Sequence, residues 1–517
     1  MKKDLAHYNY KKATLIVILF SFIIRAFAAY NIELGNDEVY YWLLASNPAL
    51  SYFDHPPMFA WFINLFSFGL TFDNELFVRM SSLIVFSINT WIIYLIGKEI
   101  KNKRTGFIAV ILYQSSIYTF VITGIMIIPD TPLSLFWLLA MRSFIKAIAR
   151  DSIGKNEMKH MLLGGLFTGL AVLSKYQTLI IWFGVGAFIL LYRREWLKKP
   201  QFYIAGLLTL VSFTPILLWN KENDWANLSF QTNRLSFFGE IEPLYFMREL
   251  LGQLVYNNPI NVVLAIVAIA SYHKRPFLKK YYWKTLLWFG IPLSVTFLFF
   301  SLFRPTLPHW SAPAYFSLML ISAAWVEQIS KRYIPSVSIV AISLIIVALG
   351  TARLQINHGI LYGNQSDEIQ KLGEDDVTLD LYGWSQISSK FMQQSFPKHP
   401  ETKTIVARKW FNAAHLDYYL ARNNHLKLIA LSDATDIHEY LRINEIRGGI
   451  QQNENAWYIS TSRSFQDPNE YFSNTFNRIQ AVDTLAIYRN KKVVEYAFVY
   501  YLEGYKGNKA LNLSTEN

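Results

Sequence analysis

Residues 13–42 read ATLIVILFSFIIRAFAAYNIELGNDEVYYW, an apolar run followed directly by an acidic and aromatic segment. The run at 13–32 is long enough to cross about 30 Å of hydrocarbon as a helix. Arg25 interrupts it and no small-residue cleavage site follows, so we expect a retained membrane anchor rather than a signal peptide. Apolar runs and polar segments alternate in the same way further along the chain, and this alternation decides the fold.

The composition of the whole chain is that of a membrane protein. Hydrophobic residues make up 52% of the 517 residues and the mean hydropathy is +0.20, whereas charged residues reach only 17%; soluble domains carry about 25%. With no cysteine, disulfides and thiolate metal clusters are excluded. We predict an α-helical polytopic membrane domain over residues 1–354, with about 11–13 spans. The spans that we place lie near 13–32, 77–97, 105–128, 131–149, 160–174, 176–192, 202–219, 250–272, 285–303, 311–329 and 334–353.

The net charge of +12 is concentrated in the first part of the chain. Residues 1–354 hold 32 Lys and Arg against 18 Asp and Glu, whereas residues 355–517 hold 17 against 19. The basic residues gather in short clusters between apolar runs, which is typical of cytoplasmic loops and not of one contiguous nucleic-acid groove. We therefore predict a cytoplasmic N-terminus and no nucleic-acid partner. The four clusters begin at Lys2, Lys98, Arg193 and Lys274.

Residues 355–517 contain no spanning run and are predicted to form a separate soluble domain. Five short stretches are strand-like, and helix-like segments separate them. On the predicted topology this α/β domain lies outside the cytoplasm. The strand-like stretches are Thr404–Ala407, Leu426–Leu431, Trp457–Ser460, Thr484–Tyr488 and Val493–Tyr501.

Candidate chemistry gathers in the predicted outward segments, beginning with the acidic pair Asp37 and Glu38. Adjacent residues of a helix point about 100° apart, so the two carboxylates are not expected to face one small site. One acid is predicted to take a proton from an acceptor hydroxyl, with its neighbour in support. The alternative is that the pair caps a helix, because acids favour the first turn.

Residues 51–58 read SYFDHPPM and form a second outward motif. The double proline Pro56-Pro57 excludes helix and holds the loop extended. Such a rigid turn could aim His55 at a phosphate, as a cation or as a neutral hydrogen-bond donor. The alternative is a solvated surface group, which is the more common state of a lone loop histidine.

Two further charged residues emerge on the same predicted side of the membrane. Asp130 lies within Pro129-Asp130-Thr131-Pro132, where it either caps the next helix or joins Asp37 as a second acid. Lys175 ends another apolar run and either extends toward the interface or neutralises a lipid phosphate. Positive charge on the outer side is the less expected placement.

The last outward segment, residues 304–315, reads RPTLPHWSAPAY. Arg304 could form a bidentate hydrogen bond to a phosphate, and His309 lies in the same proline-rich turn. Trp310 either stacks on a sugar or anchors the turn in the membrane interface, and the interfacial role is the more common one.

Taken in order, these segments resemble the bacterial GT-C glycosyltransferases of the protein-mannosyltransferase and aminoarabinose-transferase superfamily. The resemblance implies a GT-C helical bundle in the inner membrane, with the active site and the C-terminal domain periplasmic. It also implies inverting transfer of a sugar from a polyprenyl-phosphate donor to lipid A, another envelope glycan or a protein. Five motifs over about residues 30–320 carry it: Asn36–Glu38 with Tyr41-Trp42, Tyr52–Pro57, Pro129–Pro132, Leu173–Tyr176 and His309–Tyr315.

The resemblance assigns roles to individual residues. Asp37 matches the catalytic carboxylate, and Lys175 matches a lysine that the family places at the same helix end. His55 departs from the pattern, because aminoarabinose transferases carry a lysine there in a Phe-Glu-Lys-Pro-Pro run. The residues predicted to be catalytic are Asp37, Glu38 and Asp130. Those predicted to bind the donor phosphate are His55, Lys175 and Arg304, and those predicted to bind substrate are Tyr41, Tyr52, Asp54, Tyr176, His309 and Trp310.

Other classes of protein fit the sequence less well. A polytopic transporter or flippase of lipid-linked precursors would place polar residues in mid-span on broken helices, whereas here they collect in outward loops. A scaffold with a sensor domain leaves the outward charges unexplained. No cofactor is implied and no metal site is predicted, because no His and Asp cluster has metal-ligand spacing; a need for a divalent metal stays open. The expected partners are the lipid-linked donor, the acceptor and membrane lipids.

Overall fold

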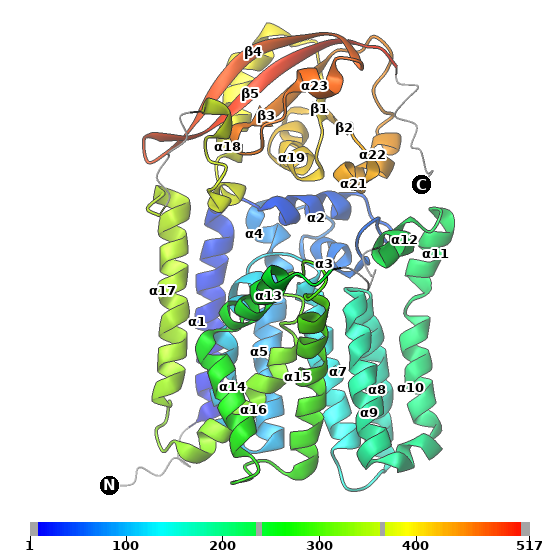
Figure 1. The fold of residues 1–517 in the computed structure, drawn as a ribbon, viewed down its shortest axis with the longest axis vertical. Coiled ribbons are helices and arrows are strands. Elements are labelled where there is room, and N and C mark those ends of the chain that lie inside the picture. Colours follow the sequence, from blue (N-terminus) through cyan, green and yellow to red (C-terminus); the bar gives the residue numbers. More distant parts are fainter. Residues whose placement is uncertain (1–8, 234–239, 362–367, 508–517) are drawn as a thin grey trace. The chain divides into compact units, whose positions relative to one another are not determined.

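The computed structural model describes residues 9–233, 240–361 and 368–507, and it divides into two compact units (Figure 1). Unit 1 comprises Met1–Tyr30 and Ala49–Ala348, and unit 2 comprises Asn31–Pro48 and Leu349–Asn517. The segment that carries Asp37 and Glu38 therefore groups with the C-terminal residues and not with the membrane helices.

Unit 1 is a bundle of helices, most of which run side by side (Figure 1). Short one-turn helices interrupt it at Tyr118–Ile122, Tyr176–Leu179 and Arg194–Lys198. The helices are α1 (Tyr10–Asn31), α3 (Met58–Phe66), α4 (Glu75–Val78), α5 (Met80–Ile100), α6 (Lys103–Gln114), α7 (Asp130–Ile148), α8 (Lys155–Val172), α9 (Ile180–Tyr192), α10 (Pro200–Val211), α11 (Thr214–Glu222), α12 (Ala226–Asn233), α13 (Pro243–Tyr256), α14 (Pro259–Ser271), α15 (Lys280–Phe300), α16 (Ala314–Ile329) and α17 (Ser336–His358).

Each of the eleven predicted spans coincides with a helix or a helix pair. Among the described residues, six helices are long and apolar enough to cross a membrane, or seven if the bent pair α13 and α14 counts as one span. The six are α1, α5, α7, α10 continued by α11, α15 and α17. The prediction of a polytopic α-helical membrane protein is confirmed as a class, and the count of 11–13 spans stays a prediction.

One predicted span differs from the structure. Residues 250–272 were expected to form one helix, but α13 starts earlier and meets α14 at an angle of 96°. Pro259 begins α14 and Asn258 caps it at a φ of 70°, with its side chain accepting from the Ile260 amide. A proline at the first helical position and a left-handed residue before it end one helix and start another.

Small residues allow several helices of unit 1 to approach closely. A Cβ atom on Gly165 of α8 would lie 2.2 Å from the carbonyl oxygen of Ala205 on α10. A Cβ atom on Gly97 of α5 would lie 2.6 Å from the Cα of Gly106 on α6. Such contacts are the usual means of helix association in lipid.

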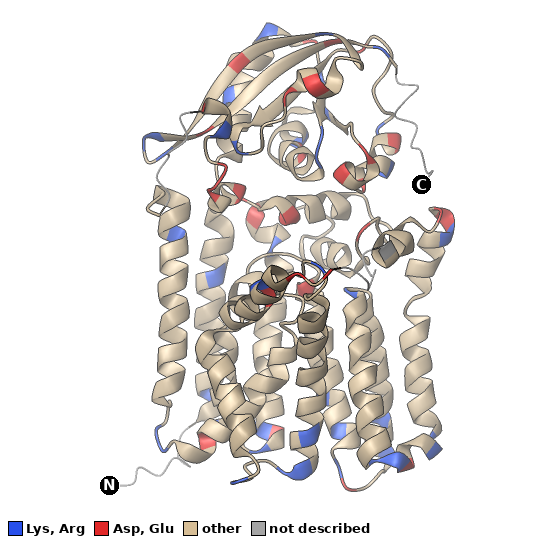
Figure 2. Ribbon diagram, in the orientation of Figure 1, with Lys and Arg blue, Asp and Glu red and all other residues tan. Residues whose placement is uncertain are grey.

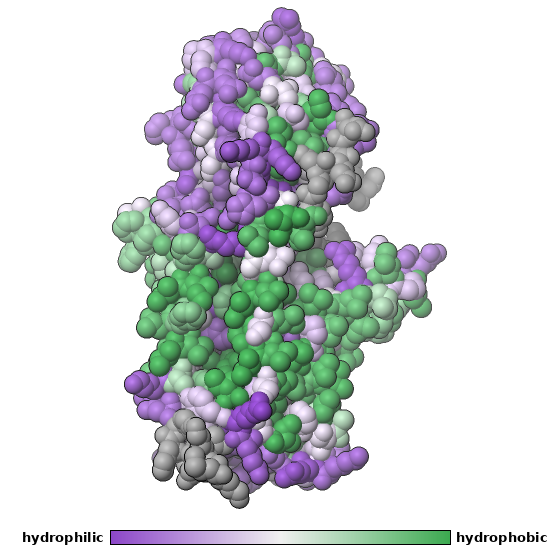
Figure 3. Space-filling view, turned by 90° about the vertical axis from the view of Figure 1, so that its left-hand side faces the viewer, coloured by the Kyte–Doolittle hydropathy of each residue, from purple (hydrophilic) through white to green (hydrophobic). Residues whose placement is uncertain are grey.

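The outer surface of unit 1 is apolar. Leu19, Phe20 and Ile23 of α1 are 63%, 66% and 57% exposed, and Figure 3 shows a band of hydrophobic residues over the helices. Large exposed apolar patches mark surfaces that lipid or a partner covers, and lipid is the expected cover on a helix as long and apolar as α1.

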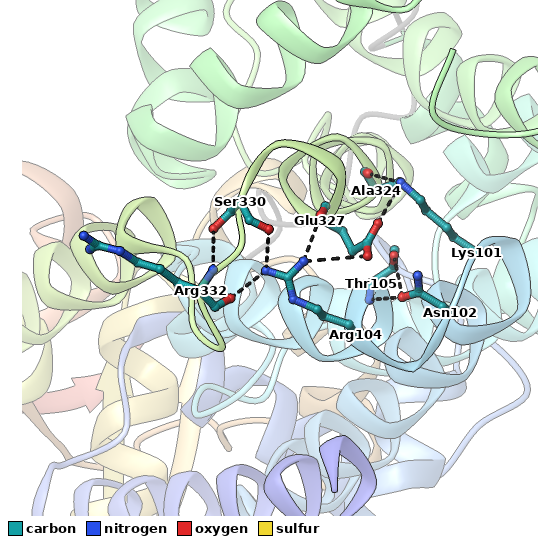
Figure 4. A network of polar contacts seen from close by, with 8 residues as sticks. All are labelled: Lys101, Asn102, Arg104, Thr105, Ala324, Glu327, Ser330 and Arg332. Carbon is teal, nitrogen blue, oxygen red and sulfur yellow. Dashed lines mark hydrogen bonds and ion pairs between the residues drawn. The ribbon is translucent and has the colours of Figure 1, made fainter. Parts of the chain in front are cut away.

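Basic residues of unit 1 gather at one end of the helices (Figure 2). There Arg104, at the start of α6, donates to the carbonyl oxygens of Glu327, Ser330 and Arg332 at 2.8, 2.9 and 2.6 Å (Figure 4). Lys101 donates to Ala324 O at 2.8 Å and pairs with the Glu327 carboxylate at 2.8 Å. Lys101 and Arg104 thus donate hydrogen bonds to carbonyl groups at the C-terminal end of α16. Their positive charges are also favourable at the negative end of the helix dipole.

Unit 2 is an α/β domain, as predicted, and all five predicted strands form. They make one mixed sheet in the order β2-β1-β3-β5-β4, in which β1 is parallel to β2 and β3 and the other pairs are antiparallel. The strands are β1 (Thr404–Ala407), β2 (Lys427–Ala430), β3 (Ala456–Thr461), β4 (Phe476–Arg489) and β5 (Lys492–Tyr505). The helices are α2 (Asn36–Ser46), α18 (Trp384–Lys390), α19 (Trp410–Leu416), α20 (Arg422–Asn424), α21 (Ala434–Ile437), α22 (Tyr440–Ile446) and α23 (Pro468–Phe472).

Aromatic packing fixes α2 within unit 2. The ring of Tyr40 lies 5.1 Å from that of Trp410 on α19, and Trp42 meets the edge of Tyr418 at 5.0 Å. The Leu34 amide donates to the Tyr419 hydroxyl at 2.6 Å, just before α2 begins. Residues more than 360 positions apart in the chain therefore build one local core.

Candidate active site

A charged cluster in unit 1 is centred on Asp130, the first residue of α7. Its side chain is fully buried and forms an ion pair with Lys175, which follows α8. The Tyr118 hydroxyl donates to Asp130 Oδ1 at 3.0 Å. A carboxylate is favourable at the N-terminus of a helix, and a buried one also needs a cation and hydrogen-bond donors.

His309 belongs to the same cluster. Burial of its ring lowers the pKa of His309 to about 4, and the positive charge of Lys175 acts in the same direction. The charges of Asp130 and His55 also act on this ring. The structure thus brings together four residues from four separate sequence motifs: His55, Asp130, Lys175 and His309. At neutral pH, His309 is an uncharged hydrogen-bonding group beside the lysine.

The double-proline loop is held by hydrogen bonds along its backbone. His55 Nε2 lies 3.7 Å from Asp54 Oδ2, and the His55 carbonyl accepts from the Tyr52 amide at 3.1 Å. Asn227 of α12 donates to Tyr52 O at 2.7 Å and accepts from the Tyr176 hydroxyl at 2.6 Å. Asn227 therefore links two of the predicted substrate residues, although sequence reasoning did not single it out.

A buried carboxylate on α13 holds the proline-rich turn that carries His309. Glu249 Oε2 accepts from the Thr306 hydroxyl at 2.7 Å, and Oε1 accepts from the Ser311 hydroxyl at 3.0 Å and from Gln253 at 2.9 Å. These bonds fix the chain on both sides of His309. Sequence reasoning also missed Glu249, although an ionisable residue within an apolar segment is by default a candidate functional residue.

The other two candidate residues of this turn, Arg304 and Trp310, each contact a phenylalanine ring. The Arg304 guanidinium lies 5.1 Å from the centroid of the Phe300 ring. Trp310 lies 5.8 Å from Phe297, and its carbonyl accepts from Gln177 at 2.8 Å. The roles of Arg304 and Trp310 at phosphate and sugar stay predictions.

Within unit 2, the two acids of α2 differ in their surroundings. Glu38 is buried and Asp37 is exposed. Glu38 Oε2 accepts from the Gly35 amide at 3.0 Å and so caps the helix that it belongs to. The neighbouring Asn36 side chain is bonded to His415 Nε2 at 2.9 Å, and Tyr41 is buried against Tyr40. Asp37 is therefore the more exposed of the two acids, and its catalytic role stays a prediction.

In the part of the chain that the structure describes, no group of three or more His, Asp and Glu side chains is arranged to hold a metal ion.

Comparison with known proteins places the fold. Residues 54–219 match the model of the dolichyl-phosphate-mannose-protein mannosyltransferase family. The structure of ArnT from Cupriavidus metallidurans bound to undecaprenyl phosphate is similar with a TM-score of 0.63 at 13% identity, covering 94% of this chain and 97% of that chain. The structure of the same protein in the apo state is similar with a TM-score of 0.61, again at 13% identity. This match covers 95% of this chain and 98% of that chain.

A sequence relative adds to this. The lipid A galacturonosyltransferase RgtD of Rhizobium johnstonii is 25% identical over 233 residues, which are 41% of this chain. The match spans about half of that relative, 47% of its length. The chain thus has the fold of the GT-C glycosyltransferases, and the resemblance to the protein-mannosyltransferase and aminoarabinose-transferase superfamily is confirmed.

Proposed function

We propose that this protein is an inverting glycosyltransferase of the inner membrane, which moves a sugar from a polyprenyl-phosphate donor to lipid A or another envelope glycan on the periplasmic side. The observation that carries the proposal is the cluster of His55, Asp130, Lys175 and His309, of which the first three lie within residues 54–219, the segment that matches the mannosyltransferase model. The ArnT complex with undecaprenyl phosphate supports a lipid-phosphate donor, and the relative RgtD supports lipid A as the acceptor.

The cluster suits a phosphate leaving group. In the reaction, an acceptor oxygen attacks C1 of the sugar, the bond from C1 to the phosphate oxygen breaks, and polyprenyl phosphate leaves with the electron pair. Negative charge then builds up on the phosphate, and prearranged cations and donors stabilise it. Lys175 supplies the charge, and its ion pair with Asp130 holds it in place. His309 and His55 supply N–H donors on the same phosphate.

Asp37 is the proposed partner of the acceptor. If the acceptor is a hydroxyl, its proton passes to the Asp37 carboxylate as the new bond forms. If the acceptor is a phosphate monoester that is already ionised, no proton has to be removed, and Asp37 orients the acceptor instead. The two cases differ in how far Asp37→Asn reduces the rate.

Transfer by the purified protein tests the proposal. The protein in lipid nanodiscs is incubated with synthetic polyprenyl-phosphate sugars and with lipid A, a lipid-free glycan or an acceptor peptide, and products are weighed by mass spectrometry. We expect a lipid A or glycan product whose mass rises by one sugar, and a loss of that mass in cells that lack the protein. Modification of the peptide alone would assign a protein acceptor. No product from any donor, together with unchanged envelope lipids and glycans in the deletion strain, would contradict the function.

A further inference from the structure

A basic cavity of about 490 Å³ lies in unit 1 at the opposite end of the helices from Asp130. The far end of α7 marks this end, because Arg142 and Lys146 of α7 and Arg150 just after it pair there with Glu99 of α5. The cavity lies where α1 begins, α5 ends and α6 begins. Its lining includes Lys11, Trp91, Tyr94, Leu95, Lys98 and Lys103.

In the part of the chain that the structure describes, the three lysines of this cavity have no internal counter-charge. The neighbouring carboxylate Glu99 is already shared by three cations, and Glu327 is held by Lys101 and Arg104 (Figure 4). Over residues 9–233, 240–361 and 368–507, no carboxylate pairs with Lys11, Lys98 or Lys103. Three positive charges in one cavity repel each other, and an anion between them removes that repulsion.

The walls of the cavity are firmly built. Gly97 and Gly106 let α5 and α6 approach, since a Cβ on Gly97 would lie 2.6 Å from the Gly106 Cα, and this contact sets Lys98 and Lys103 on adjoining helix ends. The rings of Trp91 and Tyr94 are stacked with centroids 5.2 Å apart. Tryptophan and tyrosine favour the level of the lipid headgroups, which places the cavity at the membrane surface.

The surface next to the cavity is apolar and suits acyl chains. One turn beyond Lys11, the α1 side chains Leu15, Ile16 and Leu19 are 48%, 57% and 63% exposed. A ligand that fills both regions has an anionic head and hydrocarbon tails. We propose that this cavity binds the phosphodiester headgroup of an anionic phospholipid, with its acyl chains along α1.

The size and charge of the site fit this ligand. Cavities of about 300–1,000 Å³ are usual for small-molecule sites. Each lysine near an anionic lipid surface strengthens binding about fivefold at ordinary ionic strength. Removal of three charges is therefore expected to weaken binding by about a hundredfold.

Native mass spectrometry of the full-length protein in detergent tests the site. The protein is titrated with phosphatidylglycerol, and separately with zwitterionic phosphatidylcholine of the same acyl chains. The test variant carries Lys11→Gln, Lys98→Gln and Lys103→Gln. A charge-retaining variant carries Lys→Arg at the same three positions, and the matched control carries Lys→Gln at Lys198, Lys274 and Lys279, which are exposed at the same end of unit 1.

We expect one phosphatidylglycerol to stay bound to the wild type, the arginine variant and the control, and to be lost at least tenfold more readily from the test variant. Phosphatidylcholine should be retained equally poorly by all four. A further arm adds inorganic phosphate at millimolar concentration, which should not displace the lipid. Equal retention of phosphatidylglycerol by the test variant and the wild type would overturn the proposal. So would displacement of the lipid by inorganic phosphate, which would assign a site for the free anion. Because the arginine variant preserves charge, loss of binding there too would show that charge does not retain the lipid and would overturn the proposal.

Discussion

Asp130 and Lys175 balance one another's charge in a largely buried position. Asp130 is fully buried, and the lysine is only 12% exposed. A buried ion pair of this kind is costly to break, because the charge left behind has no partner. The pair therefore couples the stability of unit 1 to the group that is proposed to bind the donor phosphate.

We predict that Asp130→Asn lowers both stability and transfer. Loss of the carboxylate leaves the Lys175 charge uncompensated, at a cost of about 3 kcal/mol, and thermal unfolding in detergent measures it. Transfer should fall by about a hundredfold, since the lysine is no longer held in place. Asp151→Asn, in an exposed loop, is the matched control and should change neither quantity.

A double variant separates the two effects. Asp130→Asn with Lys175→Met removes both charges and should recover most of the stability, yet stay inactive. Recovery of transfer together with stability would show that the pair serves only folding.

A second prediction concerns pH and His309. The folded-state pKa is about 4, against about 6.5 for an ordinary histidine. As the pH falls below about 6.5, the unfolded chain binds a proton that the folded protein does not accept until about pH 4. The protein should therefore lose stability between pH 6.5 and 4 and show no such effect above pH 6.5. His309→Gln cannot be protonated, so melting temperatures of the variant and the wild type should diverge only below pH 6.5; parallel curves would contradict the neutral ring.

At the scale of elements, α13 presents one face to the His309 turn. Glu249, Gly252 and Gln253 lie three and four residues apart and so share a face of the helix. A Cβ on Gly252 would lie 2.1 Å from Cγ of Pro308, the residue before His309. The glycine is required for the close approach that lets Glu249 reach both hydroxyls.

We predict that Gly252→Ala displaces the turn and reduces transfer by at least about tenfold, because small displacements of binding groups have large kinetic effects. Gly206→Ala on α10 is the control. No atom lies within 4 Å of the added methyl group there, so helix propensity should stabilise that variant by up to about 1 kcal/mol. Transfer rates and melting temperatures of the two alanine variants check this. Normal turnover by Gly252→Ala would show that the position of Pro308 does not matter for the reaction.

Elements were predictable from the sequence wherever a local pattern fixes them. Apolar runs gave the helices of unit 1, and short β-rich stretches gave all five strands. The docking of α2 was not predictable, because Tyr40 and Trp410 meet through packing between distant segments that leaves no local trace. The break at Asn258-Pro259 had a local signal, but it lay inside an otherwise apolar run.

The residues of the candidate site likewise fall into those that a local sequence pattern predicts and those that it does not. His55, Asp130, Lys175 and His309 were found because prolines and charges stand out beside apolar runs. Glu249 and Asn227 were missed, since each acts by holding another segment of the chain and only the folded structure reveals that contact.

At the scale of the whole molecule, the chain passes between the two units at 30/31, 48/49 and 348/349. The cluster of His55, Asp130, Lys175 and His309 belongs to unit 1, and Asp37 belongs to unit 2. The proposed reaction requires that unit 2 and the Asp130 end of unit 1 both face the periplasm. Basic residues at the other end of unit 1 should then face the cytoplasm.

The natural absence of cysteine allows this topology to be tested with single cysteines and a membrane-impermeant maleimide. Lys198→Cys and Lys274→Cys lie at the basic end of unit 1, whereas Glu222→Cys lies at the last residue of α11 and Gln480→Cys lies on β4; all four positions are exposed. In cells with a permeabilised outer membrane, we expect labelling at 222 and 480 and protection at 198 and 274, because only periplasmic thiols are reachable. Disruption of the inner membrane should label all four, and the cysteine-free protein should give no signal. Protection at 480 with labelling at 274 would show that the protein has the opposite orientation in the membrane. Transfer to a periplasmic acceptor would then be impossible.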